Sequence, residues 1–213
     1  MSGILESGQI AQPAMPRRED FSEDDAYGTT IVIVRKGTVI IGMDSRSREH
    51  RSGRIVKEDN IKLSQITSTV YGTFSGRAKA GRKLFEAMGK WDTERKENGT
   101  ATTLKELADY GWELIQEGDG DNSYIIVGIE NKEPKAYGIR KYPKSIRLTK
   151  GYAYGSGTTF AMELMKRKFK DDMSDRYAMD LAEEILLYAA LQDKGTGGDL
   201  HGNLFITFYL IKS

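Results

Sequence analysis

The sequence predicts an α+β fold in one domain, a four-layer αββα sandwich in which two stacked β-sheets carry a pair of helices on each outer face. The predicted elements follow the order strands, two helices, strands, two helices, strand. Helices that come in pairs between antiparallel strands do not fit the single crossover helices of a parallel sheet. The 213 residues, of which 38% are hydrophobic, suffice for one domain with its own core.

The pattern of strands and helices begins only at Gly28. Residues 1–27 show neither the helical nor the strand periodicity of apolar residues. We therefore expect residues 1–28 to be a leader or propeptide and residues 29–213 to be the domain. The strands are expected at 29–35, 38–44, 61–66, 69–74, 123–130, 135–140, 146–154 and 203–211. The helices are expected at 77–89, 103–115, 160–169 and 174–189, and charged or polar loops at 46–54 and 90–100.

Composition excludes several classes of function. The net charge of +1 argues against a nucleic-acid binder, which usually carries a marked basic excess. The absence of cysteine excludes disulfides and thiolate chemistry. The apolar runs at 31–34 and 124–129 are far shorter than the roughly 20 residues of a membrane-spanning helix. We therefore expect a cytoplasmic protein that binds neither nucleic acid nor membranes.

Common catalytic and metal-binding patterns are missing. There is no G-x-S-x-G motif, and the two histidines, His50 and His201, are placed in polar loops. The segment 118–122 has acidic residues but lacks the distal glutamate of an EF-hand. From these residues alone we expect no metal site.

Thr29 has an unusual position, at the boundary between the leader and the first core strand. Cleavage after Gly28 would make Thr29 the N-terminus, with a hydroxyl and a free α-amine on adjacent carbons. An α-amine has a pKa of roughly 7.7–8.0 and can act as a general base. One residue would then supply both nucleophile and base. The alternative is that Thr-Thr merely begins a strand, as it often does.

The chain resembles the β-type subunits of the proteasome core particle, members of the N-terminal-nucleophile hydrolases, over residues 28–213. The motifs that carry the resemblance are Gly28-Thr29-Thr30, 42–46, 55–63, Ser75-Gly76, 154–157, 172–174 and 193–198. Two long spacings also agree with the family: Lys62 lies 14 residues before Gly76, and Ser156 lies 37 residues before Asp193. Ser75 stands where the family usually has alanine.

The resemblance implies a role for each matching residue. Thr29 would be the nucleophile, its amine the base, and Lys62 the cation beside the hydroxyl, held charged by Asp44. The N–H of Gly76 would stabilise the oxyanion. Ser156 and Asp193 would support the terminal amine, with Thr196 at a position that is usually serine. Taken singly, these residues have structural alternatives, such as an ion pair between Asp44 and Lys62.

The resemblance also implies a substrate pocket and partners. Phe74 and Ala78 would line the pocket for the side chain before the cut, as in the chymotrypsin-like β subunits. An apolar pocket disfavours a charged side chain, so cleavage after apolar residues is expected. The alternative is that Phe74 simply packs in the core. The partners would be other α and β subunits in stacked seven-membered rings, with unfolded polypeptides as substrates and with no metal ion or organic cofactor. In a eukaryote, a nuclear as well as cytosolic location would be expected.

Two other functions remain open. Asp44 lies 15 residues after Thr29, where the family usually has 16. Either the hairpin at Lys36-Gly37 is one residue short, or Gly28 occupies the nucleophile position and the chain is an inactive structural subunit. A free-standing N-terminal-nucleophile amidase acting on a small molecule is the remaining possibility. We expect the first of these, a hairpin that is one residue short, in which case the chain is a threonine endopeptidase subunit that is made as an inactive precursor.

Overall fold

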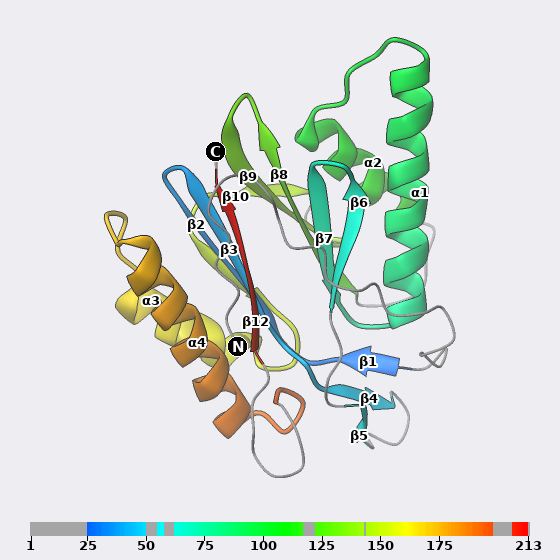
Figure 1. The fold of residues 1–213 in the computed structure, drawn as a ribbon. Coiled ribbons are helices and arrows are strands. Elements are labelled where there is room, and N and C mark those ends of the chain that lie inside the picture. The colour runs from blue at the N-terminus through cyan, green and yellow to red at the C-terminus, as the bar shows by residue number, and fades with distance from the viewer. Residues whose placement is uncertain are drawn as a thin grey trace.

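The computed structural model describes residues 25–49, 55–57, 62–116, 122–142, 144–197 and 206–212. They form four layers, in which two antiparallel sheets lie face to face and two helices cover the outer face of each (Figure 1). The predicted αββα sandwich is therefore confirmed. None of the helices in the described part of the chain is long and apolar enough to cross a bilayer.

The first main sheet has the strand order β10-β9-β8-β7-β6. Its strands are β6 (Leu63–Thr67), β7 (Val70–Ser75), β8 (Ser123–Glu130), β9 (Glu133–Ile139) and β10 (Ile146–Leu148). The second has the order β11-β2-β3-β12. Its strands are β2 (Thr30–Arg35), β3 (Thr38–Asp44), β11 (Gly151–Tyr154) and β12 (Ile206–Lys212).

Alternating side chains of the central strands belong to two different hydrophobic cores. In β2, Ile31 and Ile33 pack against the helices, whereas Val32 belongs to the cluster between the two sheets. Successive residues of a strand point to opposite faces, so a strand buried on both sides reads as a continuous apolar run. This is why β2 and β3 have almost no polar residues between their ends.

The helices bury one apolar stripe each. Helices α1 (Ala78–Glu97) and α2 (Leu104–Gln116) cover the five-stranded sheet, and α3 (Thr158–Lys168) and α4 (Asp175–Gln192) cover the four-stranded sheet (Figure 1). The N-cap of α4 is Ser174, whose hydroxyl accepts a hydrogen bond from the Tyr177 N–H.

The structure differs from the prediction in several elements. Helix α1 continues through most of the predicted loop at 90–100 and ends before Gly99, which has a positive φ. The predicted strand at 146–154 is two strands, β10 and β11, in different sheets. Part of the predicted loop at 46–54 is β4 (Ser47–Glu49), which pairs with β5 (Ile55–Lys57) and with β1 (Asp25–Tyr27). β1 lies within the predicted leader, where three residues are too few to show a period.

Candidate active site

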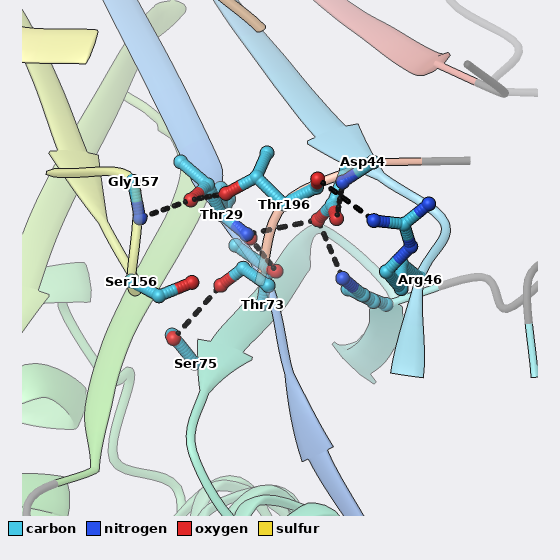
Figure 2. Close-up of polar contacts among 12 residues, drawn as sticks. Thr29, Asp44, Arg46, Thr73, Ser75, Ser156, Gly157 and Thr196 are labelled. Atoms are coloured by element: carbon cyan, nitrogen blue, oxygen red, sulfur yellow. Dashed lines mark hydrogen bonds and ion pairs between the residues drawn. The ribbon is translucent and has the colours of Figure 1, made fainter. Parts of the chain in front are cut away.

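Thr29 lies immediately before β2 and is completely buried (Figure 2). Its Oγ1 lies 2.6 Å from the Oγ1 of Thr196 and accepts a hydrogen bond of 2.8 Å from the N–H of Gly157. Gly157 is the N-cap of α3, where backbone N–H groups have no partner inside the helix. The hydroxyl at the predicted cleavage point is thus held from two segments distant in sequence.

Thr196 links the Thr29 hydroxyl to a carboxylate. The Thr196 hydroxyl donates a hydrogen bond of 2.7 Å to Oδ2 of Asp193, and the Ser156 hydroxyl donates one of 2.5 Å to the same oxygen. The N–H of Gly195 binds the other carboxylate oxygen at 3.0 Å. The three predicted residues Ser156, Asp193 and Thr196 therefore form one cluster, and this cluster is joined to the Thr29 hydroxyl.

Asp44 and Lys62 form a buried ion pair on the other side of Thr29. Lys62 Nζ lies 2.5 Å from Asp44 Oδ1, and the Thr29 N–H donates to the same oxygen at 2.9 Å. The N–H of Gly197 donates to Oδ2 at 2.8 Å. Burial raises the pKa of the Asp44 carboxyl above its ordinary value, while the charge and hydrogen bond of Lys62 and the two N–H groups act in the opposite direction.

Lys62 is connected to Thr29 through Asp44. Within the described residues, the hydrogen bonds of Thr29 Oγ1 run to Gly157 and Thr196, and none runs to Lys62. The ammonium group instead binds the carboxylate that receives the Thr29 N–H. The hydrogen bonds thus link Lys62 to the nitrogen of Thr29 through Asp44, and the predicted role of Lys62 beside the hydroxyl stays a prediction.

The Gly28–Thr29 bond is tightly enclosed. The Ser75 hydroxyl, at the end of β7, donates a hydrogen bond of 3.1 Å to the carbonyl oxygen of Gly28. A Cβ atom on Gly155 would lie 2.1 Å from that same carbonyl oxygen, and one on Gly28 would lie 2.3 Å from Asp44 Oδ2. Only glycine fits at both positions, which explains the glycine before the predicted cut.

Gly76 has a backbone conformation that favours glycine, with φ of +120°. A Cβ atom there would lie 1.8 Å from Oδ1 of Asn122, the same oxygen that accepts a hydrogen bond of 2.7 Å from the Arg77 N–H. The predicted role of the Gly76 N–H towards an oxyanion stays a prediction.

The predicted pocket residues lie in the core beneath α1. Phe74 is 4% exposed and Ala78 is fully buried, both in the cluster between the five-stranded sheet and its helices. The Phe74 ring covers Gly81, and its centroid lies 6.0 Å from that of Phe85. This packing agrees with the alternative interpretation given above, in which Phe74 is a core residue.

Three further residues complete the site, and sequence reasoning did not assign them to it. These are Gly157 and Ser75, described above, and Arg46. Arg46 Nη1 donates hydrogen bonds to the carbonyl oxygens of Lys194 and Thr196, at 3.2 and 3.3 Å. It therefore fixes the turn that carries Thr196. The available signals were the exchange of the family's usual alanine for Ser75 and the positions of Arg46 and Gly157 inside two of the motifs that carry the resemblance.

Among the described residues, no group of three or more histidine or acidic side chains could hold a metal ion. The arrangement is instead one of hydroxyls, a carboxylate and an ion pair around a single peptide bond. Such a set can hold a nucleophilic hydroxyl, orient it and accept its proton.

The chain is similar to known proteins over most of its length. The family model described as proteasome subunit matches residues 26–201. Proteasome subunit beta type-5 of Dictyostelium discoideum is 27% identical over 197 residues, covering 89% of this chain and 69% of the relative. Proteasome subunit beta type-7 of the same organism is 28% identical over 180 residues, covering 81% of this chain and 65% of that relative.

An archaeal relative gives the same result over more of its own length. Proteasome subunit beta 1 of Caldivirga maquilingensis is 26% identical over 180 residues, covering 79% of this chain and 84% of the relative. The family match spans nearly the whole domain, and these relatives are all β subunits. The chain therefore belongs to the proteasome subunit family and, within it, to the β-type subunits.

Proposed function

We propose that this chain is a threonine endopeptidase subunit of a proteasome core particle, active after cleavage between Gly28 and Thr29. The observation that carries the proposal is the convergence on Thr29 of two separate polar groups. One holds the hydroxyl through Thr196 and Gly157, and the other holds the nitrogen through Asp44. A core residue with no chemical role would not require so many buried polar partners.

The released residue would carry out acyl transfer. The Thr29 hydroxyl attacks the substrate carbonyl, the peptide bond breaks, and an ester on Thr29 is then hydrolysed by water. The new α-amine lies beside Asp44, and the Lys62 charge on that carboxylate offsets the attraction that would keep the amine protonated. The amine is then available as the general base.

The test follows the mass and the reactivity of the mature chain. The intact mass should show loss of residues 1–28, and a peptide with an electrophilic ketone should add covalently at Thr29. Thr29→Ala should abolish both leader loss and peptide hydrolysis. Thr30→Ala is the matched control. Among the described residues the Thr30 hydroxyl contacts only the hydroxyl of Thr73 on the opposite sheet, so this variant should stay active. Activity in Thr29→Ala would contradict the proposal.

Cleavage after apolar residues is part of the proposal. The two predicted pocket residues, Phe74 and Ala78, are buried and apolar, so a pocket that opens onto them would give a charged side chain no partner, and burial of an unpaired charge is costly. Reporter peptides that end in leucine should therefore be cleaved faster than those that end in arginine or glutamate. Faster cleavage after arginine would contradict this preference.

Membership of the family implies assembly with other proteasome subunits. We further propose that the chain takes one place in a seven-membered β ring stacked on an α ring, with unfolded polypeptides as substrates. Native mass measurement of the purified assembly checks the ring. A stable monomer that hydrolyses a small amide would contradict it.

A non-catalytic ring subunit is the second candidate, and one observation favours it. A Cβ atom on Gly28 would lie 2.3 Å from Asp44 Oδ2, so the position of Gly28 faces this carboxylate. Gly28 also lies 16 residues before Asp44, which is the usual spacing between the nucleophile and this aspartate in the family. In that case residues 1–28 stay attached in the assembled particle. The intact mass separates the two candidates.

A further inference from the structure

Two buried polar atoms have no hydrogen-bond partner among the described residues. They are the hydroxyl oxygen of Tyr154 and Nε of Arg140. Tyr154 is only 5% exposed and packs in the hydrophobic cluster between the two sheets. A polar group that is buried without a partner costs free energy, so such groups often serve a ligand.

The charge of Arg140 is also unpaired within the described part of the chain. Two nearby lysines do have partners, since Lys135 pairs with Glu130 and Lys144 with Asp109. Arg140 forms no ion pair with a described carboxylate. It is half-buried, so part of its side chain reaches solvent.

The alternation of side chains along β9 places Arg140 next to Tyr154. Ala136 belongs to the cluster between the sheets, whereas Tyr137 packs against the helices. Successive residues of a strand point to opposite faces, so Gly138 and Arg140 face the second sheet. A Cβ atom on Gly138 would lie 2.4 Å from the Tyr154 hydroxyl oxygen. Burial raises the pKa of Tyr154, and the positive charge of Arg140 acts to lower it.

The strand register brings this pair to the end of the sheets that holds the candidate site. Ser75, which binds the Gly28 carbonyl, pairs with the first residue of β8, and Arg140 follows the last residue of β9. On the second sheet, Tyr154 pairs with the residue after Thr29. Because β8 separates β7 from β9, Arg140 begins two strand spacings from Ser75, or about 10 Å.

The position of β1 indicates which side of the cut Arg140 serves. β1 pairs with β4 and contacts β7 and α1, so the residues before Gly28 lie on the β7 side of the bond (Figure 1). A substrate whose carbonyl takes the place of the Gly28 carbonyl would direct its preceding residues the same way. The residues after the cut would then leave towards β8 and β9. An extended peptide advances about 3.3 Å for each residue, so about three residues span the 10 Å.

We propose that Arg140 and Tyr154 form a subsite for a carboxylate of the substrate on the leaving-group side of the cut, an inference that rests on the proposed function. The carboxylate accepts hydrogen bonds from the Arg140 guanidinium and from the Tyr154 hydroxyl. The planar guanidinium can bind both oxygens of a carboxylate at once. The carboxylate is that of an acidic side chain within about three residues after the cut, or that of the C-terminus of a substrate ending there.

The experiment measures kcat and KM for matched reporter peptides with the purified protein. Each peptide has leucine before the cut and either glutamate or glutamine at one of the three positions after it. At one position or more, kcat/KM should be at least about 10-fold higher with glutamate, mainly through a lower KM. A second pair has glutamine at these positions and ends there in a free carboxylate or an amide. A gain in the first pair assigns the subsite to acidic side chains, and a gain in the second assigns it to the C-terminus.

Variants connect the preference to the two residues. Arg140→Gln should reduce the ratio between the charged and the neutral peptide to about one, and Tyr154→Phe should lower it several-fold. Arg147→Gln is the matched control for charge, because Arg147 pairs with Tyr137 and so lies on the opposite face of the same sheet. Tyr152→Phe is the matched control for the hydroxyl, because Tyr152 lies on the same face of β11 as Tyr154. Both controls should keep the ratio of the parent.

The outcomes separate this inference from the proposed function. If the parent cleaves charged and neutral peptides equally well, the inference is wrong and the proposed function stands. If the parent cleaves none of the peptides, both are wrong. A ratio that survives in Arg140→Gln, or that falls equally in Arg147→Gln, also overturns the inference. Urea unfolding checks that each variant is folded. Arg140→Lys keeps the charge without the planar fork and should give an intermediate ratio.

Discussion

The ammonium nitrogen of Lys62 lies 2.5 Å from Oδ1 of Asp44, and neither side chain is exposed to solvent. A lysine buried this completely needs a charged partner, and a carboxylate buried this completely needs several donors. Asp44 has them in Lys62 and in the N–H groups of Thr29 and Gly197. The pair therefore ties the start of β2, the end of β3 and the turn after α4 into one unit.

Replacement of Lys62 by methionine should strongly destabilise the protein. The substitution leaves the Asp44 carboxylate buried without its cation, which typically costs about 3–5 kcal/mol. The free energy of unfolding, measured in urea, checks the size of the loss. The double variant Lys62→Met with Asp44→Asn removes both charges and should recover part of it. A loss below about 1 kcal/mol for the single variant would mean that the pair behaves as if exposed.

Gly81 on α1 should not tolerate alanine while Phe74 is present. A Cβ atom on Gly81 would lie 2.5 Å from Cδ1 and Cγ of the Phe74 ring, and overpacking of this kind costs about 1–3 kcal/mol. The better helix propensity of alanine would offset about 1 kcal/mol of this. Urea unfolding of Gly81→Ala should therefore show a net loss, and Lys83→Ala, an exposed change on the same helix, should show none.

A second variant links that loss to the ring itself. Phe74→Leu makes room beside Gly81, so adding Gly81→Ala to it should cost less than Gly81→Ala costs in the parent. An equal cost in both backgrounds would show that the Phe74 ring moves freely out of the core. That result would favour the predicted role of Phe74 in lining the substrate pocket over a purely structural role in the core.

The sequence predicted the layers and most strands, because those depend on the periodicity of apolar residues. β3 and β8 begin and end where predicted, since each is an apolar run bounded by turn or polar residues. The predicted end of α1 was wrong because the residues after Gly89 are mostly polar. Between Gly89 and the end of the helix only Asp92 is buried, and only Trp91 and Arg95 are half-buried. The periodicity of apolar residues cannot detect helical turns that bury so few apolar side chains.

The sequence predicted which residues belong to the candidate site, but not how they are arranged around Thr29. Asp44, Lys62, Ser156, Asp193 and Thr196 were named from motif order and spacing. Which of them binds the hydroxyl of Thr29 and which its nitrogen depends on the register of the β2–β3 hairpin, where the Thr29 carbonyl accepts from the Asp44 N–H. A shift of one residue reverses the face of every side chain, so spacing alone cannot decide it.

The capping box at the start of α2 should make stability depend on pH. The N–H and hydroxyl of Thr103 both donate to Oε2 of Glu106 at 2.8 Å, and these bonds hold the pKa of Glu106 below its ordinary value. A lowered folded-state pKa gives stability that is present above the unfolded pKa and is lost as the pH falls through the folded value. Glu106→Gln should therefore be less stable than the parent at pH 7, by a gap that closes under acid conditions.

Urea unfolding of both proteins at pH 7 and below the unfolded pKa of about 4.3 measures that gap. Thr103→Ala removes the N-cap hydroxyl and should cost about 1 kcal/mol at neutral pH. A gap between parent and Glu106→Gln that stays constant with pH would show that the carboxylate charge contributes nothing to the cap.

Gly155→Ala should leave the chain folded but block removal of residues 1–28. Gly155 has φ of +122°, and its Cβ would lie 2.1 Å from the Gly28 carbonyl oxygen and 2.7 Å from the Thr29 Cα. The bond to be cut must move away, and the contact of Gly28 with Ser75 moves with it. Backbone strain alone accounts for about 1–3 kcal/mol of lost stability.

Gly99→Ala is the control, because Gly99 also has a positive φ, +74°, but nothing lies within 4 Å of its added Cβ. Both variants should lose stability in urea, and only Gly155→Ala should retain the leader by intact mass. Retention in Gly99→Ala as well would trace the defect to folding, and normal leader loss in Gly155→Ala would show that cleavage does not require the enclosed geometry of the Gly28–Thr29 bond.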